Sequence, residues 1–129
     1  MLQKFHRLAI YVPLSNVDLA ADTDIISANA LQEMLQTFRK YAFAGKVGTY
    51  NNVTEISRNE ETFTPTQASK PTEGAADATS YVASARLVTY IPITTTSEDL
   101  SILIEEMVSI HPWEHPVLEV DEVSLWMPS

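Results

Sequence analysis

The sequence predicts an α+β fold in which a strand-helix-strand unit occurs twice and both helices cover one face of a four-stranded antiparallel sheet. The segment RLAIYVPL (7–14) returns as RLVTYIPI (86–93), with arginine, leucine, tyrosine and proline in register. A stripe of apolar residues with helical period follows each copy, and an alternating pattern follows each stripe. Two such units with a single helical layer make the ferredoxin-like arrangement.

The two repeated segments are the first strands of the two units. Both contain several β-branched and aromatic residues, which favour strands. Each ends in a proline, which cannot donate to a sheet ladder and is therefore found at strand edges and ends. We expect strands within 7–14 and 86–93.

Apolar residues at spacings of three and four predict the two helices. The first stripe predicts a helix over 28–43, with Gly45 placed to end it in a left-handed conformation. The second stripe predicts a helix over 97–110. Its alternative N-caps are Thr95, which has capping-box spacing to Glu98, and the next two residues, Thr96 and Ser97.

The pattern changes to a period of two after each helix. The segment KVGTYNNVTEI (46–56) predicts the second strand and VLEVDEVSLW (117–126) the last one. In the last strand the apolar positions switch face halfway along. We therefore predict a bulge near Asp121 or Glu122, which would restore the register.

Between the two units, residues 57–80 contain one large apolar side chain, Phe63. A connection of this length without secondary structure is uncommon in a compact domain. It is either a polar loop pinned by Phe63 or a segment that packs on a neighbouring subunit or covers a ligand. A shorter loop is expected over 15–28, and 1–129 is expected to form one domain.

Composition excludes several classes of function. The chain has 17 acidic and 8 basic residues and a formal charge of -9, which repels nucleic acid and anionic membranes. It has no cysteine, so disulfides and thiolate sites are excluded. The N-terminal apolar run of about seven residues is too short for a signal peptide, and no apolar stretch is long enough to span a bilayer. We expect an acidic cytoplasmic protein.

The segment HPWEHP (111–116) carries the candidate metal ligands His111, Glu114 and His115. Proline disfavours the α region for the residue before it, so both histidines are biased towards extended geometry. In a strand their Cα atoms would lie about 13 Å apart, too far to share one ion. The alternatives are a tight turn that brings them together, and a structural role in which Trp113 anchors the entry to the last strand.

Catalytic motifs are weaker. Glu114 and His115 supply an acid and a base near Ser109, but no glycine-flanked nucleophile accompanies them. The three glycines do not form a phosphate-binding loop. We therefore expect that the protein is not an enzyme and has no catalytic residues.

Three segments resemble the inserted middle domain of YqfO-like proteins, which are relatives of the dinuclear-metal Ngg-interacting factors. IHPWEHPVLEV resembles a signature shared with CutA-like proteins, GKVGTYNNVT resembles a glycine-tyrosine stretch, and ETFTPTQASKPTEG resembles a glycine-proline stretch. Together they cover most of the chain from Ala44 to Val120. The matching positions are Gly45, Gly48, Tyr50, Phe63, Pro65, Pro71, Gly74, His111, Pro112, Trp113 and Glu114.

The sequence departs from that pattern at several positions. Glu61 and Ala68 replace glycines of the loop, Val53 replaces a cysteine, Trp113 a tyrosine, and His115 a glutamate. The family's two metals belong to flanking domains that this chain does not contain, so the dinuclear site is not transferred.

The resemblance implies a stand-alone domain related to CutA and to PII-like signalling proteins. Such domains form trimers whose sheet edges pair between subunits and whose clefts hold small molecules or ions. An open four-stranded sheet has two edges that need cover, which independently favours a homo-oligomer, with a trimer first and a dimer next.

We therefore predict a non-catalytic oligomeric binding or regulatory module that senses an ion or small metabolite at an intersubunit cleft. One alternative is an assembly protein that docks on another polypeptide, and another is a divalent-metal-binding protein of CutA type. No resident cofactor is expected, although a divalent metal fits the last alternative. The candidate ligand-binding residues are His111, Trp113, Glu114, His115, Tyr50 and Phe63.

Overall fold

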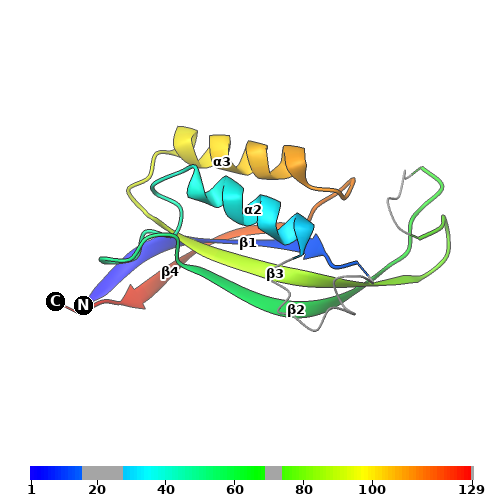
Figure 1. Ribbon diagram of the computed structural model, residues 1–129, viewed down its shortest axis with the longest axis horizontal. Helices are drawn as coiled ribbons and strands as arrows, with labels where there is room; N and C mark the ends of the chain where they lie inside the picture. The colour runs from blue at the N-terminus through cyan, green and yellow to red at the C-terminus, as the bar shows by residue number, and fades with distance from the viewer. Residues whose placement is uncertain (16–27, 69–73, 129) are drawn as a thin grey trace.

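The computed structural model describes residues 1–15, 28–68 and 74–128. Its elements are β1 (Leu2–Pro13), α2 (Asn29–Arg39), β2 (Thr54–Phe63), β3 (Ser80–Pro92), α3 (Ser97–Ile110) and β4 (Leu118–Trp126). The strands form one antiparallel sheet in the order β2-β3-β1-β4, and both helices lie on one side of it (Figure 1). The predicted α+β ferredoxin-like fold is confirmed.

The two repeated segments are direct neighbours at the centre of the sheet. Leu8 pairs with Thr89 and Ile10 with Leu87, so the copies run antiparallel beside each other. Because side chains alternate along a strand, Leu8, Ile10 and Val12 of the first copy and Leu87 and Ile91 of the second point to the same face. This duplicated pair is the platform on which the helices pack.

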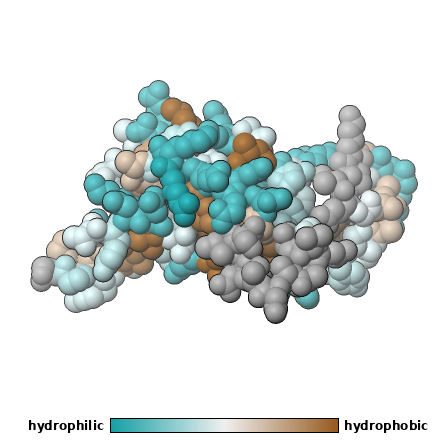
Figure 2. All heavy atoms as spheres, in the orientation of Figure 1, coloured by the Kyte–Doolittle hydropathy of each residue, from teal (hydrophilic) through white to brown (hydrophobic). Residues whose placement is uncertain are grey.

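The core lies between that platform and the helices. Both strands and both helices contribute fully buried side chains, whereas the outer surface of the helical layer is mainly hydrophilic, with small apolar areas over α3 (Figure 2). The largest buried side chains of this cluster are Leu8, Ile10, Leu31, Met34, Phe38, Leu87, Ile91, Leu103 and Met107.

The first helix is shorter than predicted, because the chain must leave it to reach the sheet. α2 ends at Arg39, and the residues up to Gly45 form turns. The Gly45 N–H donates to the Tyr90 carbonyl over 2.8 Å, and the Gly45 carbonyl accepts from the Val53 N–H over 2.9 Å. Gly45 therefore joins the end of β3, which a helix continuing to residue 43 would prevent.

The second strand lies further along the chain than predicted. Residues 47–50 form a tight turn closed by reciprocal hydrogen bonds between Val47 and Tyr50, and Asn52 has a positive φ of 57°. β2 then occupies Thr54–Phe63, so the predicted polar loop over 57–80 is wrong for its first seven positions. As an edge strand that is polar on both faces, this segment has little hydrophobic signal.

The last strand has no bulge. Its register with β1 is continuous from Leu2 opposite Trp126 to Ile10 opposite Leu118. The predicted switch of register near Asp121 is wrong, because Val123 and Leu125 simply lie on the face of the sheet away from the helices. There Val123 is the register partner of Phe5, which is fully buried outside the main core.

The second helix matches its predicted bounds. Among the alternative caps the structure selects Thr96, whose hydroxyl accepts from the Asp99 N–H over 3.1 Å. Further along α3, Glu106 binds the residues that follow α2: it accepts from the Lys40 ammonium at 2.9 Å and from the Tyr41 hydroxyl at 3.1 Å.

Two predictions concern residues outside the described ranges. Most of the expected loop over 15–28 and the matching position Pro71 fall in the segments 16–27 and 69–73. None of the helices in the described part of the chain is long and apolar enough to cross a membrane.

We predict that Gly45→Ala lowers the free energy of unfolding by at least about 2 kcal/mol, and Gly48→Ala by about 1 kcal/mol. Both glycines have positive φ, but a Cβ on Gly45 would lie 2.6 Å from the Val53 backbone nitrogen. A Cβ on Gly48 would meet the flexible end of Met127 at 3.3 Å. Urea denaturation of both variants checks this, and equal losses would contradict it.

Candidate functional site

His111 joins the helical layer to the central strand. It follows α3 directly, is buried, and its Nε2 lies 2.5 Å from the Tyr11 carbonyl oxygen. Its Nδ1 accepts from the Trp113 backbone N–H over 3.0 Å, and the two rings lie 5.3 Å apart. Both ring nitrogens are therefore used inside the fold.

These contacts define the protonation of His111. Since Nδ1 accepts from an N–H, the proton resides on Nε2 and is donated to the Tyr11 carbonyl. Burial lowers the pKa of His111, although the hydrogen bond to Tyr11 acts in the opposite direction. The ring is a neutral structural element at neutral pH, with no lone pair directed to a ligand.

The other residues of this segment are more exposed. The His115 side chain is 88% exposed, and its Nε2 lies 3.7 Å from Glu114 Oε1. No group of three or more histidine, cysteine, aspartate or glutamate side chains is arranged to hold a metal within residues 1–15, 28–68 and 74–128. HPWEHP thus serves as the entry to β4, with the Val117 carbonyl also accepting from the Tyr11 N–H.

Tyr50 and Phe63 lie far from this segment. Tyr50 is 73% exposed in the turn over residues 47–50, in which Gly48 approaches the Met127 side chain. Phe63 is the last residue of β2, whereas Tyr50 precedes the first residue of that strand. The six candidate binding residues from the sequence therefore do not gather into one site, and their role in binding stays a prediction.

Polar side chains gather instead on the face of the sheet away from the helices. This face is here called the open face because neither helix packs on it, and it also carries the buried residues Phe5, Ala9, Ser84 and Val88. Its charged residues follow from the alternation along each strand, because they occupy the positions between those that face the helices. They are four carboxylates and two guanidinium groups: Glu55, Glu61, Glu119, Asp121, Arg7 and Arg86.

Most of these groups are hydrogen-bonded to each other or to a tyrosine hydroxyl on the same face. Arg7 makes two hydrogen bonds to Asp121, at 2.7 and 3.2 Å. The Arg86 Nε–H donates to the Tyr11 hydroxyl at 3.2 Å, and that hydroxyl lies 3.4 Å from Glu119. These contacts tie β1 to β3 and β4 across the open face.

Glu61 differs from the other carboxylates. Its Oε2 is the one buried side-chain oxygen without a hydrogen-bond partner among the described residues. Burial raises the pKa of Glu61, and the nearby Ser84 hydroxyl opposes part of this shift. Ser84 is fully buried, and its oxygen lies 3.5 Å from the Asn59 amide nitrogen.

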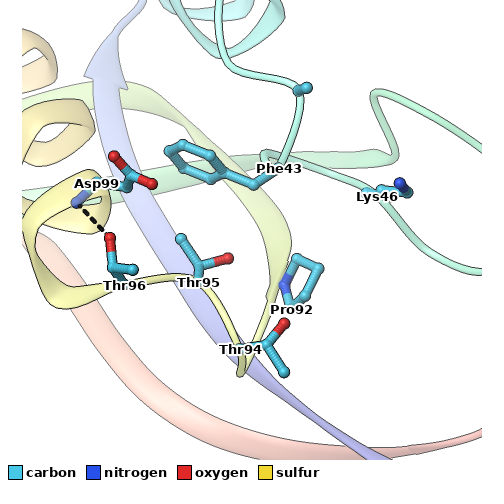
Figure 3. A pocket seen from close by; sticks show the side chains of 8 residues that line it. Phe43, Lys46, Pro92, Thr94, Thr95, Thr96 and Asp99 are labelled. Atoms are coloured by element: carbon cyan, nitrogen blue, oxygen red, sulfur yellow. Dashed lines mark hydrogen bonds between the residues drawn. The ribbon is translucent and has the colours of Figure 1, made fainter.

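A hollow of about 350 Å³ lies at the opposite end of β3, between the turn that follows α2 and the start of α3 (Figure 3). Phe43 and Pro92 line it together with threonines and the charged residues Lys46 and Asp99. Sequence reasoning missed both this hollow and Glu61. In the sequence, one feature distinguishes Glu61 from the other acidic residues: it replaces a glycine of the glycine-proline stretch that resembles the YqfO-like domain.

No protein-family model matches the chain, and no curated protein does. Similar solved structures include a Bacillus cereus protein related to NIF3, at 20% identity and a TM-score of 0.65 over 95% of this chain and 26% of that protein. A phage SAM lyase in complex with S-methyl-5'-thioadenosine has 12% identity and a TM-score of 0.56, covering 94% and 88%. The periplasmic divalent cation tolerance protein CutA from Archaeoglobus fulgidus has 11% identity and a TM-score of 0.49, covering 91% and 81%.

These matches concern the fold. The likeness to the NIF3-related protein supports the resemblance that the sequence motifs indicate, and this chain spans 26% of that protein's length. The same fold therefore occurs as part of a larger protein and, in the phage lyase, as nearly a whole enzyme chain.

We predict that His111→Ala lowers the free energy of unfolding by about 2–4 kcal/mol, because it removes a buried ring and leaves the Tyr11 carbonyl without its partner. His115→Ala is the matched control and should change it by no more than about 0.5 kcal/mol, since its side chain is 88% exposed. Chemical denaturation at pH 7.5 measures both values. Similar losses for the two variants would contradict the structural role of His111.

The same histidine should make stability depend on pH. The folded state lowers the pKa of His111, so the unfolded chain binds the proton first as pH falls below about 6.5. Stability should decline from that pH down to the lower pKa of the folded state. The free energy of unfolding of His111→Gln, measured by chemical denaturation, should decline less over this pH range.

Proposed function

We propose that this chain is a non-catalytic, oligomeric binding module of the cytoplasm, which takes up a small ligand on the open face in a cleft completed by another copy. The fold shared with the NIF3-related protein is consistent with a small binding or regulatory domain. The open face supplies the polar groups that such a ligand would need.

The buried Oε2 of Glu61 carries this proposal. A buried polar atom without a hydrogen bond costs about 1–3 kcal/mol, so native proteins rarely retain one without a reason. A ligand that donates an N–H, or a cation, would supply the missing partner. The formal charge of -9 favours a cationic ligand through long-range attraction.

The environment of Glu61 fits a ligand that is part apolar and part cationic. Val82, its register partner on β3, is buried, and Phe63 lies two residues further along the same face of β2. The Asn59 amide nitrogen donates to the Ser84 oxygen, which leaves the side-chain carbonyl oxygen of Asn59 as a further acceptor on the same face. An amine attached to a short carbon chain has the matching chemistry.

Assembly of several copies is part of the proposal. β2 and β4 are the two edges of the sheet, and each has backbone groups on one side without a neighbouring strand among the described residues. Pairing with the edge strand of a second, identical copy satisfies these backbone groups. We propose a trimer, with a dimer as the next arrangement.

A second candidate is an enzyme that cleaves SAM. Two observations favour it: the fold resembles a phage SAM lyase, and a carboxyl group with a raised pKa lies on the sheet. Formation of S-methyl-5'-thioadenosine from SAM requires that the sulfur leaves with the electron pair of one C–S bond, while the carboxylate oxygen of the same SAM molecule attacks that carbon and forms a C–O bond, which yields a lactone. A carboxylate beside the sulfonium could hold the substrate by charge.

We expect 1,4-diaminobutane to raise the melting temperature of the wild-type protein saturably, because a ligand that binds the folded state stabilises it. 1,4-Butanediol, which has the same length without charge, should not do so. Glu61→Gln should weaken the amine about tenfold or more, since it removes a charge-assisted hydrogen bond.

Glu60→Gln is the matched control. Glu60 is the neighbour of Glu61 in β2, but it is exposed and lies on the face of the helices. The control should bind the amine like the wild type. Equal weakening by both variants, or no stabilisation by amines, divalent cations or nucleotides, would overturn the proposal.

Incubation with SAM separates the two candidates. A binding module should release no S-methyl-5'-thioadenosine above the spontaneous rate, measured by liquid chromatography. Product that forms with the wild type and with Glu60→Gln, but not with Glu61→Gln, would replace the leading proposal with the enzymatic one.

A further inference from the structure

The hollow beside the start of α3 is separate from the open-face site. It adjoins Pro92 at the end of β3, whereas Glu61 pairs with Val82 near the start of that strand. Ten residues of extended chain span about 33 Å, so one small ligand cannot occupy both places. Its volume of about 350 Å³ is at the small end of the range for ligand pockets.

One wall of this hollow is apolar. Phe43 packs partly against the core, and its ring lies 5.6 Å from that of Tyr41, which holds it in place. Figure 3 shows Phe43 facing the segment that carries Pro92 and Thr95. A short aliphatic or aromatic group would fit between these surfaces, and the hydroxyls of Thr94 and Thr95 lie beside it.

The hollow also has one positive and one negative side chain. Lys46 and Asp99 lie on opposite sides of Phe43 in Figure 3. Within the described residues neither side chain takes part in an ion pair. The hydrogen bond of Asp99 to Thr96 uses its backbone N–H, so the carboxylate remains available.

We propose that this hollow binds a small zwitterion, an α-amino acid with an apolar side chain. Its carboxylate would bind the Lys46 ammonium, its ammonium group would bind the Asp99 carboxylate, and its side chain would pack on Phe43 and Pro92. A ligand with no net charge matches a site with one charge of each sign. A simple anion would meet both Asp99 and the repulsion of a chain with formal charge -9.

The probes are L-valine, L-leucine and L-phenylalanine, titrated into the full chain by calorimetry and by ¹H–¹⁵N NMR. At least one should bind saturably and shift the amide signals of residues 42–46 and 92–99. For L-leucine, two analogues test the charges: 4-methylpentanoate lacks the ammonium group, and 3-methylbutylamine lacks the carboxylate. Each analogue should bind about tenfold more weakly than the amino acid or worse.

Variants test the assigned residues. Lys46→Met and Asp99→Asn should each weaken the amino acid about tenfold or more. Glu98→Gln is the matched control, because Glu98 is in the same first turn of α3 but does not line the hollow. Glu61→Gln should leave amino-acid binding unchanged, so failure here is distinguishable from failure of the open-face site.

Three results would overturn the proposal. The first is that none of the three amino acids binds saturably. The second is that either singly charged analogue binds as tightly as L-leucine. The third is that Asp99→Asn and Glu98→Gln weaken binding equally. The analogue comparison uses the wild-type chain and does not depend on the folding of any variant.

Discussion

Burial of the central strand pair beneath the helices determines the rest of the structure. Leu8 and Ile10 of β1 and Leu87 and Ile91 of β3 are fully removed from water beneath the helices. Burial of such side chains stabilises the fold by about 1.5–3 kcal/mol each. Because strand side chains alternate, the same pairing directs Arg7, Tyr11 and Arg86 to the opposite face, so the core and the open face arise together.

The entry to β4 depends on this platform as well. A strand at the edge needs its start positioned on the central pair, and the neutral ring of His111 does so by donating to the Tyr11 carbonyl. A histidine with both nitrogens occupied differs from a metal ligand, which must offer a lone pair. A motif that suggests chemistry in the sequence is therefore part of the architecture.

The two sites that we propose for ligands lie near the two ends of β3 instead. Near its start, Glu61 has a buried oxygen without a partner among the described residues. Near its end, Lys46 and Asp99 face one hollow with an apolar wall. In both places a polar or charged group lacks a partner among the described residues, so a ligand that supplies the partner would gain from binding.

The duplication, the approximate bounds of α3 and β4, and the placement of both helices on one face could be predicted from the sequence, because they follow from periodic apolar residues that each segment carries locally. The sequence pattern placed β2 too early in the chain. An edge strand with two polar faces lacks apolar periodicity, and the segment with Gly48 and Asn52 forms a turn instead of a strand. The three-dimensional contacts were needed to see that both ring nitrogens of His111 have partners and that Glu61 Oε2 has none among the described residues. Satisfaction of a polar group depends on neighbours distant in sequence, such as Tyr11 for His111, and no local pattern specifies them.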